Sequence, residues 1–423
     1  MDQTERIMHA ELLRFITCGS VDDGKSTVIG RLLYDSKAIF EDQLAAIAAT
    51  SQRRGLSQAD LALLTDGLQA EREQGITIDV AYRYFSTPAR RFIIADTPGH
   101  EQYTRNMVTG ASTADLAVIL VDARRGVLPQ TRRHAHLVRL LGISQVVLAV
   151  NKMDLADYDE AVFARVRDDF LAFAAPLGFS EIVPVPMSAL EGDMVVERGD
   201  GLSWYKGPTL LQVLERAPVD AALVHAPFRF PVQRVERLGE EDDGVERRGF
   251  QGRIESGTIA VGESVVILPA GVSSTVASIQ TYDGPLRDAR AGQSVTLTLA
   301  DQVDISRGDT IAASDCPPRC EKSFEALVCW FSATPFDSSR RLLLRHGTRT
   351  VRAKVDAVAC KLDVNTSAQV PAPSQVAMND IVRATFRVQQ PLAFDAYEAN
   401  RPNGSFILID EVTNDTVAAG MMQ

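Results

Sequence analysis

The feature that most constrains the fold of this chain is a glycine-rich motif between an apolar run and a helical pattern. The motif matches G-x-x-x-x-G-K-[ST] and comprises Gly19, Ser20, Val21, Asp22, Asp23, Gly24, Lys25 and Ser26, with Thr27 following it in the predicted site. Backbone N–H groups of such a loop and the N-terminus of the next helix attract phosphate oxygens. Lys25 would contact the β- and γ-phosphates, and the Ser26 hydroxyl would hold Mg²⁺. The motif therefore predicts a nucleoside triphosphate site rather than an ordinary glycine-containing turn.

A second polar motif, Asp96-Thr97-Pro98-Gly99, directly follows the apolar run FIIA. An aspartate at the end of a buried strand is poorly placed for packing, but it is well placed to hold Mg²⁺ through water. Gly99 has no Cβ and would let the backbone approach a γ-phosphate closely. D-x-x-G alone is a weak signal, but after a phosphate-binding loop it strengthens the prediction of a triphosphate site.

A third motif, from Asn151 to Asp154, closes the apolar run VVLAV. The Asp154 carboxylate can accept hydrogen bonds from N1–H and the exocyclic amino group of guanine, which adenine does not offer. The aliphatic stem of Lys152 can lie along the ring face. As the third motif in order along an α/β pattern, this segment predicts specificity for guanine, with GTP and GDP as the ligands.

Two shorter segments complete the predicted site with less specificity. Ser188, Ala189 and Leu190 follow the run EIVPVPM, where the Ala189 N–H would meet the guanine O6. Thr77 lies in GITI before a predicted strand, where its hydroxyl would join Ser26 on Mg²⁺ and its amide would touch the γ-phosphate. Taken alone, the first segment is an ordinary loop and the second is a β-branched strand start.

The first half of the chain alternates apolar runs with helical patterns, which is typical of a mostly parallel α/β sheet with helices on both faces. The expected strands are 15–18, 80–85, 92–95, 116–121, 146–150 and 182–186, and the expected helices are 25–33, 102–111, 131–141, 157–177 and 209–215. An Ala-, Leu- and Gln-rich stretch at about 34–72 interrupts this alternation and is expected to be a helical insert.

From about residue 227 short β-branched runs are separated by Gly, Asp and Pro, which is typical of antiparallel barrels. The predicted organisation is a phosphate-binding α/β domain followed by two β-barrels, resembling the layout of elongation factors. The boundaries are expected at 1–222, 223–315 and 320–423, with Cys316-Pro-Pro-Arg319 as the linker between the barrels.

Charge and composition restrict the partners and the compartment. The net charge of −11 argues against nucleic acid as the main partner, although a local basic face can hide in an acidic total. No run of about 18 apolar residues predicts a membrane span, and no secretion signal is visible at the N-terminus, so we expect a cytoplasmic protein. The five cysteines are scattered, and reduced thiols are expected rather than a zinc site at Cys316 and Cys320.

Two other candidate groups are not expected to be functional. His134 and His136 are two positions apart on a predicted helix, so they do not share a face and are not expected to bind a metal. The acidic run 240–243 is expected to be a solvated hairpin turn.

The segments G-x4-GKS, GITI, DTPGH and NKMD, followed by two barrels, resemble the translation-factor GTPases over nearly the whole chain. Within that superfamily the chain is most similar to the GTPase subunits of bacterial sulfate adenylyltransferases (ATP sulfurylases). The similarity rests on LLRFITCGSVDDGKSTVIGRLLYD, on the insert before EREQGITIDVAYRYF, and on DTPGHEQYTRNMVTGASTADLAVILVDARRGVLPQTRRH.

The resemblance implies a heterodimer with a separate catalytic (small) subunit, in which GTP hydrolysis drives formation of adenosine 5′-phosphosulfate from ATP and sulfate. It also implies that His100, next to Gly99, orients the attacking water; the alternative is that His100 only packs against the first helix. No second G-x4-GK[ST] occurs, so an adenylylsulfate kinase domain would have to be associated with this chain or fused after residue 423.

Two other functions stay open at this point. One is an elongation factor that delivers aminoacyl-tRNA, which would bind RNA with a strong salt dependence. The other is a regulatory GTPase switch, whose hydrolysis rate would not respond to ATP and sulfate.

Overall fold

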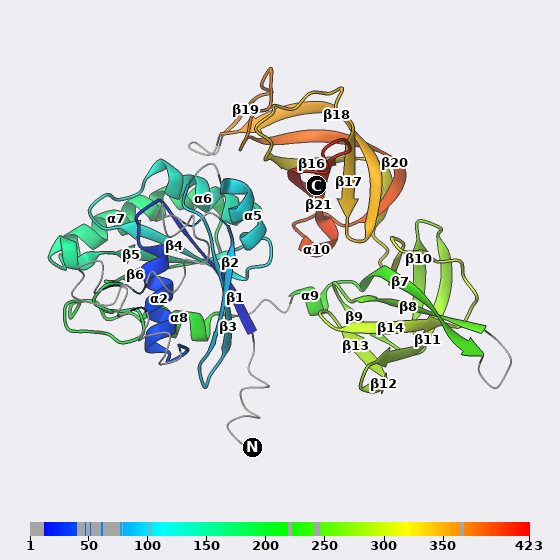
Figure 1. The fold of residues 1–423 in the computed structure, drawn as a ribbon, viewed down its shortest axis with the longest axis horizontal. Helices are drawn as coiled ribbons and strands as arrows, with labels where there is room; N and C mark the ends of the chain where they lie inside the picture. The colour runs from blue at the N-terminus through cyan, green and yellow to red at the C-terminus, as the bar shows by residue number, and fades with distance from the viewer. Residues whose placement is uncertain are drawn as a thin grey trace. The chain divides into compact units, whose positions relative to one another are not determined.

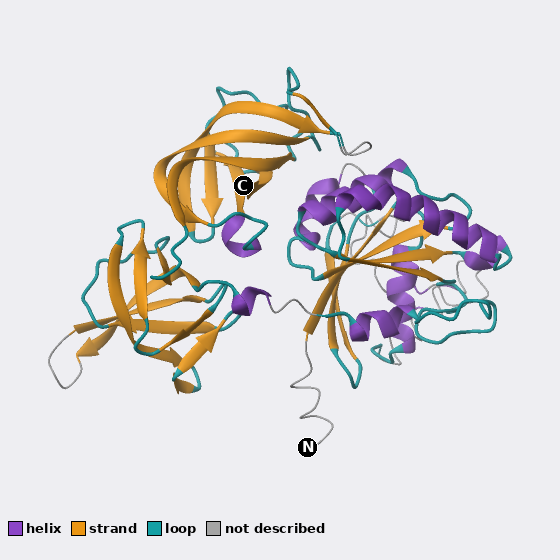
Figure 2. Cartoon of the chain, turned by 180° about the vertical axis from the view of Figure 1, so that it is seen from behind, coloured by secondary structure: helices purple, strands orange, loops and turns teal. Residues whose placement is uncertain are grey.

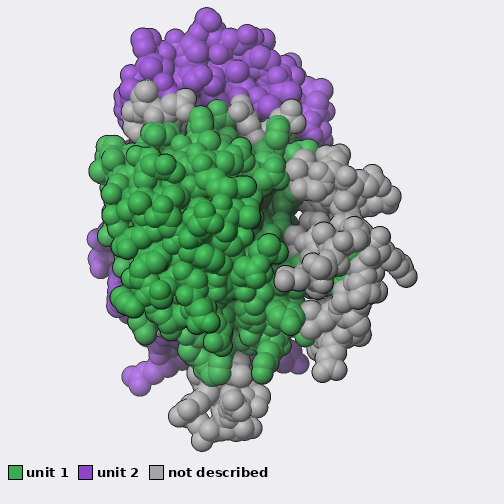
Figure 3. All heavy atoms as spheres, turned by 90° about the vertical axis from the view of Figure 1, so that its left-hand side faces the viewer, with its two compact units in different colours: residues 1–219, 364–367 green, residues 220–363, 368–423 purple. Residues whose placement is uncertain are grey.

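The computed structural model describes residues 12–39, 47, 51, 61, 77, 79–100, 103–218, 222–240, 246–363 and 368–423. The described residues form two compact units, one within residues 1–219 and the other within residues 220–363 and 368–423 (Figure 3). Each unit is described by itself below.

The first unit is built on a six-stranded sheet with the order β2-β3-β1-β4-β5-β6. Its strands are β1 (Leu12–Gly19), β2 (Ala81–Ser86), β3 (Arg91–Asp96), β4 (Leu116–Asp122), β5 (Gln145–Asn151) and β6 (Glu181–Pro186). All neighbours are parallel except β2 and β3. Every residue of β4 is buried, as expected for a central strand that is covered on both faces. The predicted α/β sheet is therefore confirmed.

Helices cover both faces of this sheet (Figures 1 and 2). They are α2 (Lys25–Asp35), α5 (Thr104–Ala111), α6 (Pro129–Leu140), α7 (Glu160–Ala174) and α8 (Leu210–Arg216), with the short 3-10 helices η3 (Met153–Ala156) and η4 (Ala175–Leu177). Helices α5, α6 and α7 lie on one face, and α2 and α8 lie on the other (Figure 1). Because β1, β3, β4 and β5 run parallel to one another, their carboxyl ends lie at the same edge of the sheet, where the predicted motifs begin.

Helix α8 offers a direct test of local stabilisation. The Thr209 hydroxyl accepts a hydrogen bond from the Gln212 N–H (3.3 Å), and the Gln212 side chain accepts one from the Thr209 N–H (3.2 Å), which is a capping box. We expect Thr209→Ala to lower the free energy of unfolding by about 1 kcal/mol and Thr209→Ser to retain it. Chemical denaturation of both variants is the measurement, and equal midpoints for Thr209→Ala and wild type would contradict the role of the cap.

The second unit contains two closed antiparallel barrels. After helix α9 (Ala222–His225), the first has the strand order β10-β15-β7-β8-β14-β11-β12, and pairing of β10 with β11 closes it. The strands of this part are β7 (Arg229–Glu240), β8 (Glu246–Arg253), β9 (Thr258–Ala260), β10 (Ser264–Leu268), β11 (Val272–Thr281), β12 (Gly284–Leu286), β13 (Asp288–Arg290), β14 (Ser294–Leu299) and β15 (Thr310–Ala313).

The second barrel has the order β17-β21-β22-β16-β20-β18-β19, and pairing of β17 with β18 closes it. Its elements are β16 (Arg319–Trp330), β17 (Leu342–His346), β18 (Arg349–Leu362), β19 (Gln369–Pro371), β20 (Ile381–Phe394), α10 (Arg401–Gly404), β21 (Ser405–Asp410) and β22 (Thr416–Met422). Each barrel has its own apolar core, with Phe230 and Ile267 in the first and Phe386 and Phe394 in the second.

A buried ion pair joins residues of the two barrels. The side chain of Arg229 is 1% exposed, and its Nε and Nη2 donate to the two carboxylate oxygens of Asp395 at 2.9 and 3.0 Å. Asn403 also donates to Asp395 at 2.8 Å. The carboxylate is thereby satisfied, as a buried charge requires.

Several expectations fall outside the described residues or are not decided by the fold. Most of the predicted insert at 34–72 and the greater part of the acidic run 240–243 lie outside the described residues. The exact domain boundaries stay predictions. All five cysteines are free thiols, and β16 begins at Arg319, the last residue of the expected linker.

Candidate nucleotide-binding site

The glycine-rich loop connects the carboxyl end of β1 to the first residue of α2, Lys25. Gly24 has φ +92°, and a Cβ there would lie 2.4 Å from Nδ2 of Asn151. Only glycine combines that backbone conformation with the close approach. Asp22 also has a positive φ (67°), so the loop takes an irregular path before the helix begins.

Side chains fix the start of the loop. The Ser20 N–H donates to Oδ2 of Asp23 (2.6 Å), and Asn151 Nδ2 donates to the Asp23 carbonyl (2.8 Å). The Gly19 N–H donates to Nδ1 of His134 on α6 (3.1 Å). Burial lowers the pKa of His134 to about 3, so its ring is neutral and Nδ1 can accept this bond. The loop is therefore held in shape by the protein itself.

Lys25 is buried within the loop that it follows. Its Nζ donates to the carbonyls of Gly19 (3.2 Å) and Ser20 (2.8 Å). Burial lowers the pKa of Lys25, while nearby Asp96 and Asp23 act in the opposite direction. A Cβ on Gly99 would lie 2.5 Å from this Nζ. The second predicted motif thus meets the first at the lysine, where a Cβ at position 99 would displace Nζ and crowd the Gly19 carbonyl oxygen (3.0 Å).

The predicted Mg²⁺ ligands are Ser26, Thr77 and Asp96, and the structure describes each of them. Asp96 is 1% exposed at the end of β3, and its Oδ1 accepts a hydrogen bond from Thr17 of β1 (3.2 Å). Ser26 is half-buried in the first turn of α2. Thr77 is half-buried, but its neighbours 76 and 78 lie outside the described residues. A carboxylate and a hydroxyl oxygen are the donors that Mg²⁺ prefers, so these residues fit that ion.

The third motif provides an unpaired acceptor. Asp154 lies in η3, just beyond the end of β5, and its Oδ1 is buried without a hydrogen-bond partner among the described residues. A buried carboxylate oxygen without a donor costs free energy, so a ligand with N–H groups fits this position. Lys152, with φ +63°, donates from Nζ to the Asp22 carbonyl and lies 3.2 Å from Oδ2 of Asp122.

The segment from Ser188 to Leu190 differs in detail from the prediction. The Ala189 N–H, expected to face guanine O6, donates to Oδ1 of Asn151 at 3.0 Å. Because Asn151 also contacts the glycine-rich loop, it joins three segments of the site. Ser188 Oγ accepts from the Glu191 N–H (3.2 Å), and the Leu190 side chain is exposed. A contact from Ala189 to a guanine would have to share that amide with Asn151.

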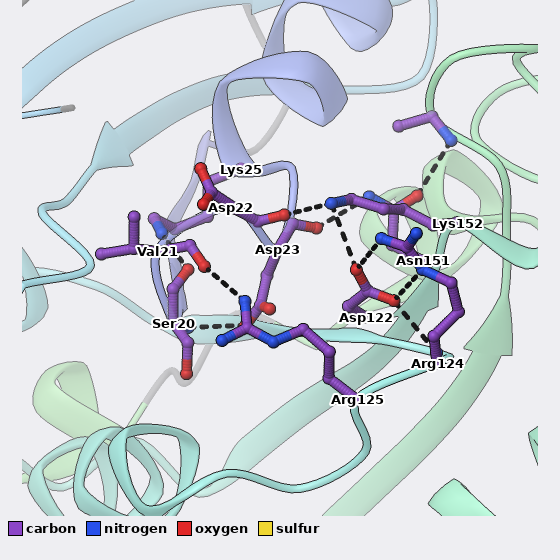
Figure 4. A network of polar contacts seen from close by, with 11 residues as sticks. Ser20, Val21, Asp22, Asp23, Lys25, Asp122, Arg124, Arg125, Asn151 and Lys152 are labelled. Atoms are coloured by element: carbon purple, nitrogen blue, oxygen red, sulfur yellow. Dashed lines mark hydrogen bonds and ion pairs between the residues drawn. The ribbon is translucent and has the colours of Figure 1, made fainter. Parts of the chain in front are cut away.

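Sequence reasoning missed a set of charged residues after β4. Oδ2 of Asp122 accepts from Arg124 Nη2 (2.7 Å) and lies near Lys152, while Arg125 Nη1 donates to the Val21 carbonyl (3.2 Å) (Figure 4). Burial alone would raise the pKa of Asp122, but hydrogen bonds from Arg124 and the hydrogen bond and charge of Lys152 lower it to about 2. The available signal was a polar residue at the end of a wholly apolar strand, the same signal that marks Asp96 and Asn151.

The three histidines considered from the sequence have different environments. His100 is exposed, and its ring centroid lies 6.1 Å from that of Tyr103. His134 is buried against the glycine-rich loop, and His136 packs edge-on against Phe173. No group of three or more His, Cys, Asp or Glu side chains in the described part of the chain is arranged to hold a metal ion.

Three family models match successive parts of the chain. Residues 10–220 match the family model "Elongation factor Tu GTP binding domain", residues 251–312 match "Elongation factor Tu domain 2", and residues 323–423 match "GTP-eEF1A C-terminal domain-like". The family of the first domain implies binding of a guanine nucleotide.

Among the described residues, no helix has the length and apolar character needed to span a membrane.

Curated relatives match along nearly the whole chain. Sulfate adenylyltransferase subunit 1 of Aliarcobacter butzleri (strain RM4018) is 53% identical over 418 residues, covering 98% of this chain and 87% of that protein. The same subunit of Methylorubrum populi (strain ATCC BAA-705 / NCIMB 13946 / BJ001) is 54% identical over 415 residues, with coverages of 98% and 87%. Bifunctional enzyme NodQ of Rhizobium sp. (strain N33) is 52% identical over 413 residues, covering 97% of this chain and 63% of NodQ. A solved structure of sup35 complexed with GDP aligns at 24% identity and a TM-score of 0.44, covering 100% of this chain and 96% of that chain.

Proposed function

Because the chain belongs to the family of sulfate adenylyltransferase subunit 1, we propose that it is the GTPase subunit of such an enzyme. It hydrolyses GTP, and a separate catalytic subunit forms adenosine 5′-phosphosulfate and diphosphate from ATP and sulfate. The observation that supports this most is the identity of 53% over 98% of the chain and 87% of a relative named as that subunit. The alternative of an aminoacyl-tRNA carrier is not better supported by these relatives, and the net charge of −11 does not favour it.

The proposed guanine contacts rest on Asp154. Its buried, unpaired Oδ1 would accept from the base, and Lys152, held by Asp122 and by the Asp22 carbonyl, would lie along the ring. Asn151 would position the base site relative to the phosphate site through its bonds to Asp23 and Ala189. Adenine lacks the two N–H donors that match a carboxylate here, so GTP is the proposed nucleotide.

The phosphate contacts are proposed for the loop and Lys25. On binding, the Lys25 Nζ would exchange the Gly19 and Ser20 carbonyls for phosphate oxygens, gaining charge-assisted hydrogen bonds. Ser26, Thr77 and Asp96 would hold Mg²⁺ directly or through water, and that ion would neutralise charge on the β- and γ-phosphates. The N-terminus of α2 adds favourable potential for the anion.

His100 is proposed to orient the attacking water. It directly follows Gly99, which lies beside the Lys25 Nζ, and its ring is exposed to solvent, where a water could reach it. The water oxygen forms a bond to the γ-phosphorus while the bond from that phosphorus to the β-phosphate oxygen breaks, releasing GDP and phosphate. Such a reaction depends mainly on positioning and on charge stabilisation.

We expect His100→Ala to reduce GTP hydrolysis by about 10²-fold while GTP affinity changes little, because the residue acts on the water rather than on the nucleotide. Single-turnover hydrolysis and equilibrium binding measure the two quantities separately. His225→Ala is a matched control, since His225 lies in the short helix α9 of the other unit. Wild-type hydrolysis by His100→Ala, in the presence of the partner subunit, ATP and sulfate, would leave His100 with only a structural role.

The nucleotide preference tests the proposed function itself. The chain is mixed with its catalytic subunit, Mg²⁺, ATP and sulfate. Phosphate release is expected when GTP is added to this mixture, and not when the same concentration of further ATP is added instead. Release from ATP alone, with GTP inert, would contradict the proposal.

A further inference from the structure

The two adjacent arginines after β4 have different surroundings. Arg124 is neutralised by Asp122, to which its Nε and Nη2 donate at 3.1 and 2.7 Å. Arg125 is exposed, and no carboxylate among the described residues lies within ion-pair distance of it. Its guanidinium donates instead to a main-chain carbonyl, that of Val21, at 3.2 Å. One arginine therefore belongs to an ion pair. The other belongs to none among the described residues, and its charge acts on Asp23 of the loop, whose pKa is raised by burial and shifted in the opposite direction by the charges of Lys25 and Arg125.

The backbone brings this charge to the glycine-rich loop. The N–H groups of Arg125 and Gly126 both donate to the Asp122 carbonyl at 3.0 Å, which forms a tight turn at the carboxyl end of β4. Gly126 has φ +69°, a conformation that glycine adopts readily. Figure 4 shows the Arg125 guanidinium directed at the Ser20–Val21 part of the loop, away from Asp122 and Lys152.

The chemistry of the guanidinium indicates its ligand. A guanidinium has five N–H donors in a planar fork that fits phosphate oxygens, and the Val21 carbonyl uses one of them. The loop it contacts is the proposed site for a triphosphate, so the remaining donors would have an anion within reach. Positive charge at this position favours the transition state of phosphoryl transfer, where charge spreads over the transferred oxygens.

We propose that Arg125 is a catalytic residue of the GTPase reaction, supplied by this chain itself, which binds the triphosphate and stabilises the charge that develops during hydrolysis. The inference rests on the proposed nucleotide site. Water attacks the γ-phosphorus, the bond to the β-phosphate oxygen breaks with its electron pair on GDP, and the water proton passes to the released phosphate or to solvent. Arg125 exchanges no proton and contributes hydrogen bonds and positive charge only. The Val21 carbonyl holds the guanidinium at the loop and reduces the freedom lost on binding.

The test uses the complete complex with the catalytic subunit. Single-turnover GTP hydrolysis, GDP affinity and the thermal midpoint are measured for wild type, Arg125→Ala, Arg125→Lys and Arg167→Ala. Arg167 is a control of the same residue type, because it lies on α7 and pairs with its neighbour Asp168. We expect Arg125→Ala to lose about 10³-fold in hydrolysis rate with GDP affinity and thermal midpoint unchanged. Arg125→Lys should fall between, since a point charge lacks the fork.

Binding of GDP with aluminium fluoride, which mimics the transferred phosphoryl group, should be lost in Arg125→Ala and kept in Arg167→Ala. A hydrolysis rate within threefold of an active wild type would overturn the inference and leave the proposed function intact. Parallel losses of GDP affinity, thermal midpoint and rate would also overturn it, because Arg125 would then only clamp the loop. A wild-type complex without GTP hydrolysis would overturn the proposed function, and this inference with it.

Discussion

Lys25→Ala is expected to weaken GTP binding by about 10³-fold, or about 4 kcal/mol. In the described structure the Lys25 ammonium is buried and donates to two loop carbonyls, so it is already placed where phosphate oxygens would replace them. Each hydrogen bond to a charged group contributes about 1.5–3 kcal/mol, and the variant loses two of them. The remaining backbone N–H groups would face the polyphosphate without a compensating cation.

Isothermal calorimetry in Mg²⁺ measures this loss. Lys206→Ala is a matched control, because Lys206 is exposed and its Nζ donates only to the nearby Ser203 carbonyl (2.6 Å). The thermal midpoint of Lys25→Ala without nucleotide separates loss of binding from loss of folding. Wild-type affinity in a folded Lys25→Ala variant would remove Lys25 from the nucleotide site.

Asp154→Asn is expected to exchange the base preference of the site from guanine to xanthine. The substitution replaces an acceptor oxygen by an NH₂ group, which then faces the N1–H and amino donors of guanine. Xanthine carries a carbonyl at C2 and matches the amide. Because the Asp154 Oδ1 is buried and has no hydrogen-bond partner among the described residues, an NH₂ group at this atom would face the guanine donors, and GTP affinity should fall by about 10³-fold.

Competition between GTP and xanthosine triphosphate measures the exchange. The expected gain in affinity for xanthosine triphosphate is the informative result, since misfolding would lower the affinity for both nucleotides. Asp168→Asn serves as the control, because Asp168 is exposed on α7 and contacts Arg167. An Asp154→Asn variant that prefers GTP by the original margin would place the guanine site elsewhere.

The sequence was sufficient to predict elements whose pattern is local. The glycine-rich loop, the apolar runs of β1, β3, β4 and β5, and the motif residues at their ends lie where the strand periodicity and turn chemistry indicate. The two barrels were predicted as a class because short β-branched runs between turns require antiparallel closure. Their strand order depends on non-local pairing that periodicity does not encode.

Contacts between distant segments could not be predicted. The spacing of His134 and His136 argues against a metal pair but does not predict that His134 accepts the Gly19 N–H, 115 positions away along the chain. Arg124 and Arg125 are consecutive and chemically identical, yet one binds Asp122 and the other the Val21 carbonyl. The Ala189 amide bonds to Asn151 instead of remaining unpaired for guanine. Each of these outcomes depends on tertiary geometry rather than on residue type or spacing.

The central claim is that GTP hydrolysis by this chain drives an unfavourable adenylation on its partner. The most direct test is the plateau concentration of adenosine 5′-phosphosulfate formed by the complex from ATP and sulfate, with GTP, with GDP, or with a non-hydrolysable GTP analogue. A catalyst alone cannot move an equilibrium, so a plateau that rises only with GTP is the predicted result. An analogue that merely activates the partner would change the rate and not the plateau. Equal plateaus under all three conditions would contradict the coupling.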